Sequence, residues 1–268
     1  MKDIDDSKAP LIEHLVELRT RLLWSVVATL AAFLLCFAFA QQIFALLVQP
    51  LADAGQNRVI FTQVFEAFFT QVRVAFFGAL MLAFPVIASQ MWQFVAPGLY
   101  RQEKTALLPF LIATPFLFAL GASFAYFVAI PTALNFLLGF QGDLGTTGVT
   151  QEALPSVGNY LSFIMQFLFA FGLAFLLPVL LMLLNRAGIV SRDQLKGFRR
   201  YFIVAAFVVA AIFTPPDVVS QLLLAIPLIL LYEISIAAIW LTDRKKRASL
   251  ALSATAETLA DTGEKPAE

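Results

Sequence analysis

The chain has 268 residues, of which 60% are hydrophobic and only 13% are charged, and its formal net charge is zero. Soluble domains carry about 25% charged residues, so this composition indicates a membrane protein. The balanced charge gives no reason to expect nucleic acid as a partner. One cysteine and one histidine exclude an internal disulfide and a histidine-based metal site.

An amphipathic segment precedes the first long apolar run. In LIEHLVELRTRLL, residues 11–23, leucines at positions 11, 15, 18 and 22 recur at three- and four-residue steps and form one face of a helix. We expect this helix to lie on the bilayer surface and to turn into the membrane near Leu22. Arg19 and Arg21 then mark the cytoplasmic boundary, where basic residues are retained. Glu17 becomes a carboxylate at the membrane edge.

Six apolar runs predict an all-α integral membrane protein with six transmembrane helices. Pro50 is expected to end the first span, and Pro85 and Pro178 to kink the second and fourth. The fifth apolar run, 201–213, covers only about 20 Å of a hydrocarbon core about 30 Å thick. The predicted spans are about 22–48, 72–92, 105–138, 160–184, 199–213 and 218–240, so that residues 1–242 form one membrane domain and 243–268 a disordered cytoplasmic tail.

The distribution of basic residues predicts the orientation. If the N-terminus is cytoplasmic, every one of the 18 lysines and arginines except Arg58 and Arg73 falls in a cytoplasmic segment. The positive-inside rule therefore predicts that both termini face the cytoplasm.

Little catalytic or transport chemistry is available inside the spans. Apart from Glu233, almost no ionisable side chain lies inside the predicted spans. Ion-coupled transporters normally keep such groups at mid-membrane. No motif for nucleophilic catalysis, metal-assisted hydrolysis or phosphate binding is present, so an enzyme is not predicted. What remains is a group of carboxylates predicted to lie beside the membrane on the cytoplasmic side, Glu13, Glu17 and Glu103, which suits recognition of guanidinium groups.

Four segments resemble the TatC family, the multispanning core of the twin-arginine protein translocase. They are HLVELRTR at 14–21, FVAPGLYRQEK at 94–104, YLSFIMQFLFAFG at 160–172 and TPPDVVSQLLLAIPLILLYEIS at 214–235. The resemblance covers about residues 10–240 and implies six spans with short fifth and sixth helices. It further implies a receptor for twin-arginine signal peptides in the bacterial cytoplasmic (inner) membrane, driven by the proton gradient and without a cofactor.

The resemblance also implies particular site residues. Glu17 and Glu103 match positions that contact the arginine pair, and Arg19, Phe94, Pro97 and Leu99 match positions that shape the site. Thr214 and Gln221 match positions where the fifth and sixth helices meet a partner. The implied partners are single-span subunits of the TatA and TatB types, the signal peptides of folded precursors, lipid, and further copies of the chain. At Leu176, many members of the family instead carry Glu or Gln, so a polar contact made there would be missing or shifted.

Simpler interpretations compete with these assignments. Glu17 and Arg19 could only solvate an interfacial helix, and Glu103 could pair with Lys104 or Arg101. Gln221 could bond within its own subunit, and Glu233 could extend to water. At the level of the whole protein, the alternative function is a small-solute secondary transporter. The sequence does not identify the cargo, the copy number or the translocation path.

Overall fold

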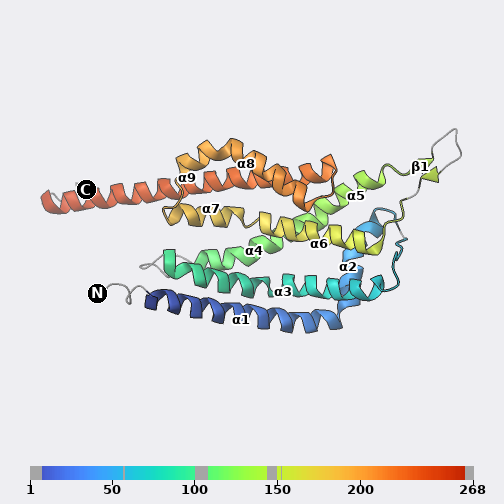
Figure 1. Cartoon of the computed structure of the whole chain (residues 1–268). Helices are drawn as coiled ribbons and strands as arrows, with labels where there is room; N and C mark the ends of the chain where they lie inside the picture. Colours follow the sequence, from blue (N-terminus) through green and yellow to red (C-terminus); the bar gives the residue numbers. More distant parts are fainter. Residues whose placement is uncertain (1–7, 57, 100–107, 144–149, 152, 263–268) are drawn as a thin grey trace, which may run out of the picture.

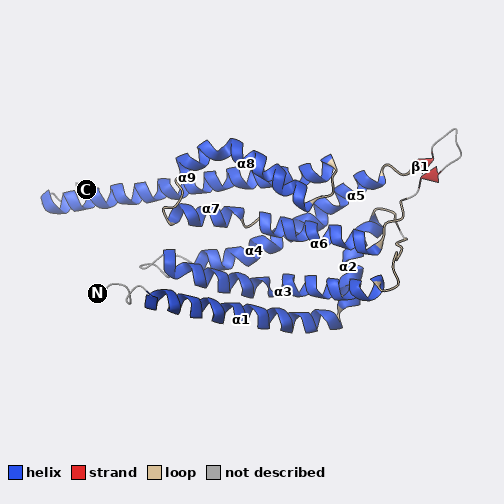
Figure 2. Cartoon of the chain, in the orientation of Figure 1, coloured by secondary structure: helices blue, strands red, loops and turns tan. Residues whose placement is uncertain are grey.

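The computed structural model describes residues 8–56, 58–99, 108–143, 150–151 and 153–262, and this part of the chain is almost entirely helical (Figures 1 and 2). The helices are α1 (Lys8–Ala38), α2 (Ala40–Asp53), α3 (Glu66–Leu99), α4 (Leu108–Phe124), the π-helical turn η2 (Ala125–Ala129), α5 (Ile130–Leu138), α6 (Val157–Ala174), α7 (Leu177–Arg186), α8 (Arg192–Phe213) and α9 (Val218–Thr262). Two strands, β1 (Gly142–Asp143) and β2 (Thr150–Gln151), pair antiparallel and are the small departure from the predicted all-α class.

The long helices run side by side in one elongated bundle (Figure 1). Packed pairs are α1 with α3, α4 with α6, and α8 with α9. The start of α1, the last turn of α3, the start of α8 and the end of α9 all lie at one end of the bundle, on the left of Figure 1, which we call the terminal end. The opposite end, with α2 and the β1–β2 pair, is called the far end.

Helix α6 lies at the centre of the bundle, and its Phe167 and Phe171 are fully buried. Its close contact with α4 depends on two glycines. A Cβ atom at Gly121 would lie 2.4 Å from the carbonyl oxygen of Phe171, and one at Gly172 would lie 2.6 Å from the Phe118 ring. Small residues at such contacts let helix backbones approach each other closely inside a membrane.

The first predicted span, 22–48, is not one helix. Helix α1 ends at Ala38, and α2 begins at Ala40 and packs against α3, α5 and α6. The prediction failed because an apolar run does not show where a helix changes direction. The new direction is fixed by distant contacts, since Tyr160 donates a hydrogen bond to the Leu47 carbonyl at 2.9 Å. Pro50, expected to end the span, lies inside α2.

The helical boundaries also differ from the second, third and fourth predicted spans. The second, 72–92, is the middle of α3, which continues through Pro85 without interruption. The third, 105–138, is divided at η2, next to Pro131, which has no N–H to donate to the ladder. The fourth, 160–184, is broken between α6 and α7, and Pro178 lies in the first turn of α7.

Five helical segments in the described part of the chain are long and apolar enough to cross a membrane: 15–38, 66–94, 109–138, 157–186 and 218–244. Helix α8 is not among them. It begins at Arg192, not near residue 199, and its first half carries five of the chain's charged residues: Arg192, Asp193, Lys196, Arg199 and Arg200. The apolar second half alone is short, as predicted.

The prediction of a disordered tail is wrong for residues 243–262, because α9 continues to Thr262; residues 263–268 lie outside the described part of the chain. The Ser, Thr and Glu content of this segment favours disorder. Its alanines, leucines, lysines and arginines are strong helix formers, and they extend a helix whose costly nucleation has already taken place in the preceding span.

Candidate functional site

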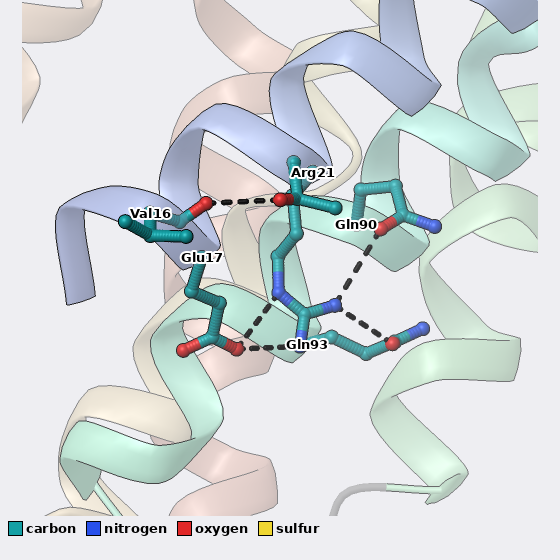
Figure 3. Close-up of polar contacts among 6 residues, drawn as sticks. Val16, Glu17, Arg21, Gln90 and Gln93 are labelled. Atoms are coloured by element: carbon teal, nitrogen blue, oxygen red, sulfur yellow. Dashed lines mark hydrogen bonds and ion pairs between the residues drawn. The ribbon is translucent and has the colours of Figure 1, made fainter. Parts of the chain in front are cut away.

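A polar cluster joins α1 to the last turns of α3 at the terminal end of the bundle (Figure 3). Glu17 and Arg21 are four residues apart on α1, so that their side chains share one face. Arg21 donates from Nε and Nη2 to the same Glu17 oxygen, Oε1, at 3.0 and 2.6 Å. This pair was not predicted, although the Glu-x-x-x-Arg spacing in the sequence could have indicated it.

Two glutamines of α3 complete the coordination of the Arg21 guanidinium. Its Nη1 donates to Oε1 of Gln93 at 2.8 Å and, more weakly, to Oε1 of Gln90 at 3.5 Å. The cation therefore links the two helices, and Figure 3 shows it between the carboxylate and the amides. Nothing in the sequence identified these glutamines as a site, because their role depends on how α1 packs on α3.

The surroundings of the cluster are partly shielded from solvent. The side chains of Arg21 and Glu17 are 22% and 32% exposed. An open hollow of about 470 Å³ beside them is lined by Glu17, Thr20, Arg21, Trp24 and Gln90. A carboxylate and amide oxygens in such a partly shielded place form stronger, more directional hydrogen bonds to a guanidinium than they would in bulk water.

The remaining residues predicted for this site are only partly brought together. Arg19 is exposed, and it lies two residues from Glu17, a spacing that places the two side chains on different faces of α1. Phe94 is half-buried and follows Gln93 directly. Pro97 and Leu99 lie beyond the predicted second span, 72–92, and their backbone forms the last turn of α3. Glu103 lies outside the described residues.

Thr214 and Gln221, predicted to contact a partner, bond within the chain. Thr214 is 7% exposed, and its hydroxyl donates to the Ala210 carbonyl at 2.9 Å. The Gln221 amide donates to the Phe207 carbonyl of α8 at 3.2 Å and so joins α9 to α8. Gln221 is only partly buried, which leaves part of its amide accessible from outside the chain.

Glu233 and Leu176 were left without a role by the sequence. Glu233 of α9 forms an ion pair with Arg199 of α8, with 2.7 Å between Oε2 and Nη2. Leu176 precedes the first turn of α7 and packs beside Phe84 and Phe118. Within the described residues no group of three or more His, Cys, Asp and Glu side chains could hold a metal ion.

These features define a multi-pass α-helical membrane protein with a guanidinium-coordinating cluster at the terminal end. Residues 13–227 match the family described as "Sec-independent protein translocase protein (TatC)". The chain belongs to the TatC family.

Relatives of the same name cover most of the chain. That of Magnetococcus marinus is 49% identical over 86% of this chain and 84% of its own length. The Aquifex aeolicus and Escherichia coli K12 proteins are 44% and 41% identical, over 89% and 87% of this chain and over 98% and 88% of their own lengths. A crystal structure described as "Twin Arginine Translocase Receptor- TatC" is 43% identical, has a TM-score of 0.74, and is matched over 85% of this chain and 98% of that one. The predicted resemblance is confirmed, and the small-solute transporter is not supported.

Proposed function

We propose that this chain is the signal-peptide receptor and core subunit of a twin-arginine translocase, and that it binds the arginine pair at the junction of α1 with the end of α3. One observation carries the proposal: the junction already holds a guanidinium, that of Arg21, between a carboxylate and two amide oxygens. The solved relative described as a twin-arginine translocase receptor supports the same assignment.

Glu17 and Glu103 are proposed as the acceptors for the incoming arginines, with Arg19, Phe94, Pro97 and Leu99 around them. Glu103 follows Leu99, the end of α3, by four positions in the sequence, and it is assigned to the site because it matches the family's motif. Arg21 holds the Glu17 carboxylate in place by occupying Oε1 from two directions.

The proposed topology has six spans with both termini in the cytoplasm, in a bacterial inner membrane. Helix α8 would be the short fifth span, with its charged first half at the cytoplasmic interface. The terminal end of the bundle then faces the cytoplasm, which agrees with the position of nearly all basic residues. The proposed partners are TatA-type and TatB-type single-span subunits, which meet the chain near Thr214 and Gln221, and further copies of the chain.

The test is site-specific crosslinking of a twin-arginine precursor to membranes that contain the chain. Glu17→Gln removes one charge-assisted contact of about 1.5–3 kcal/mol, so crosslinking should fall about tenfold or more. Asp53→Asn is the matched control, because it removes an exposed carboxylate at the far end. Replacing the precursor's two arginines by lysines should weaken binding as well, since an ammonium cannot fork onto a carboxylate.

A double-mutant cycle separates direct contact from an indirect effect. Glu17→Gln or Glu103→Gln is combined with each single arginine-to-lysine change in the precursor. Direct contact requires non-additive losses for at least one pair. Additive losses for every pair would mean that the carboxylates shape the junction from a distance, and the assignment would be withdrawn.

A further inference from the structure

Helices α8 and α9 face each other in a regular antiparallel register near the terminal end. The Tyr232 hydroxyl donates to the Leu195 carbonyl at 2.7 Å, and Arg199 is paired with Glu233 at 2.7 Å. The antiparallel order is given by three contacts along the pair, in which Phe207, Arg199 and Arg192 of α8 meet Gln221, Glu233 and Trp240 of α9 in turn. At this level of the contact, the positive charge of α8 is neutralised by an acid of α9.

Two helical turns nearer the terminal end, two cations lie near one aromatic ring. Arg192 of α8 faces Trp240, with its guanidinium carbon 5.9 Å from the ring centroid. Arg244 of α9 lies 5.6 Å from the centroid of the same ring. An aromatic face attracts a cation at such distances but cannot cancel its charge. Trp240 lies seven residues, or two helical turns, after Glu233 on α9. Arg192 therefore faces an indole where Arg199 faces a carboxylate.

No carboxylate neutralises this pair within the described part of the chain. Asp193 pairs with Lys196 at 3.5 Å, and Glu233 is used by Arg199. Asp243 is adjacent in sequence to Arg244 and points to another face of the helix. The Nε of Arg192 is buried without a hydrogen-bond acceptor among the described residues, so no group of the chain compensates the charge of this guanidinium through that atom.

The position of this pair relative to the bilayer indicates what the acceptor is. The apolar span of α9 extends to Arg244, and exposed Trp240 lies in its last turns, as tryptophans do at membrane interfaces. Helix α8 becomes apolar only at Tyr201, so its charged half lies beside apolar turns of α9. Cations at this depth are within reach of lipid headgroups but below most of the aqueous phase.

We propose that Arg192, Arg244 and Trp240 form a binding site for the phosphate of an anionic phospholipid. The two guanidinium groups donate to the phosphate oxygens, and the indole packs at the level of the glycerol backbone. Arg199, already neutralised by Glu233, lies outside the site. The site is separate from the junction of α1 and α3 and does not depend on the proposed receptor function.

The experiment measures quenching of Trp240 fluorescence by brominated lipids around the full-length protein in vesicles. Trp24→Phe and Trp92→Phe leave Trp240 as the only tryptophan, since the chain has three. Brominated phosphatidylglycerol, mixed into phosphatidylcholine, should quench Trp240 more than brominated phosphatidylcholine at the same mole fraction. Arg192→Gln with Arg244→Gln should reduce this preference about fivefold per arginine at low salt.

A control pair of substitutions and a second measurement test whether the lipid preference belongs to this site. Arg73→Gln with Arg200→Gln removes the same charge elsewhere and should leave the preference intact. Native mass spectrometry of the detergent-purified protein should show the same loss of retained phosphatidylglycerol, and the lysine pair Arg192→Lys with Arg244→Lys should be intermediate. Equal quenching by both lipids, an equal loss in the control, or full competition by inorganic phosphate would overturn the proposal.

Discussion

Arg21 is the residue on which the α1–α3 junction depends. It donates to Glu17 on its own helix and to Gln93 on α3, so one planar cation fixes a carboxylate and joins two helices. A point charge could keep the attraction to Glu17 but could not reach three acceptors in fixed directions. Arg21 therefore acts as a positioning residue for Glu17.

We predict that Arg21→Lys reduces precursor crosslinking about tenfold while the protein still inserts and keeps its partners. The reason is that the carboxylate of Glu17 loses two converging hydrogen bonds from Nε and Nη2, although the charge is retained. Arg200→Lys is the control, because Arg200 lies on α8 against Tyr201. Stronger crosslinking in Arg21→Lys would show instead that Arg21 competes with the signal peptide for Glu17.

At the scale of elements, the contact between α4 and α6 can be tested by adding one methyl group at Gly121. The obstacle to a side chain at Gly121 is a backbone oxygen, which cannot rotate away. The α8–α9 pair combines apolar packing with polar links, including the hydrogen bond from Gln221 to Phe207. We therefore expect a substitution in the α4–α6 contact to lower stability, and one in the α8–α9 pair to weaken partner binding.

For the α4–α6 contact, Gly121→Ala should lower the stability of the purified protein by about 1–3 kcal/mol, because the helices must separate to admit the methyl group. The measurement is thermal unfolding in detergent. Gly197→Ala, in α8, is the matched control, since a Cβ atom there would meet nothing within 4 Å. Equal stability of the two variants would contradict the packing argument.

For the α8–α9 pair, Gln221→Leu should weaken copurification of a single-span partner and leave precursor crosslinking unchanged. The substitution removes hydrogen bonds that contribute about 0.6–2 kcal/mol in membranes. Gln49→Leu, on α2 at the far end, serves as the comparison, and Thr214→Leu should behave like Gln221→Leu. If copurification of the partner and crosslinking of the precursor fell together, general misfolding would explain the result.

For the whole molecule, the two ends of the bundle should be on opposite sides of the membrane. Val64, between α2 and α3, is 91% exposed at the far end, and Gln194 is exposed in the first turn of α8 at the terminal end. The single native cysteine, Cys36, makes labelling straightforward once it is replaced by alanine.

We predict that an impermeant thiol reagent labels Val64→Cys in intact cells and labels Gln194→Cys only after lysis. The reason is the retention of basic segments in the cytoplasm. The reverse pattern would place the guanidinium-binding junction outside the cell and would remove the basis for the proposed function. Cells that carry only Cys36→Ala control for background labelling.

The sequence by itself determined the membrane class, the approximate position of the apolar runs and the family, because these depend on composition and on motifs that are local in the chain. It also predicted that Glu17 belongs to the recognition site. Its errors concern where a helix changes direction, as at Phe39, and how far a helix continues, as α9 does to Thr262.

Only the tertiary structure decided which distant side chains meet. Gln90 and Gln93 are ordinary helix residues until α1 packs on α3 and brings Arg21 between them. In the same way, Glu233 is paired with Arg199, and Arg192 lies against the Trp240 ring, because α8 folds back antiparallel to α9. Hydrogen bonds and ion pairs act over a few ångströms, so contacts between residues remote in the chain follow from how the helices pack and cannot be read from local patterns.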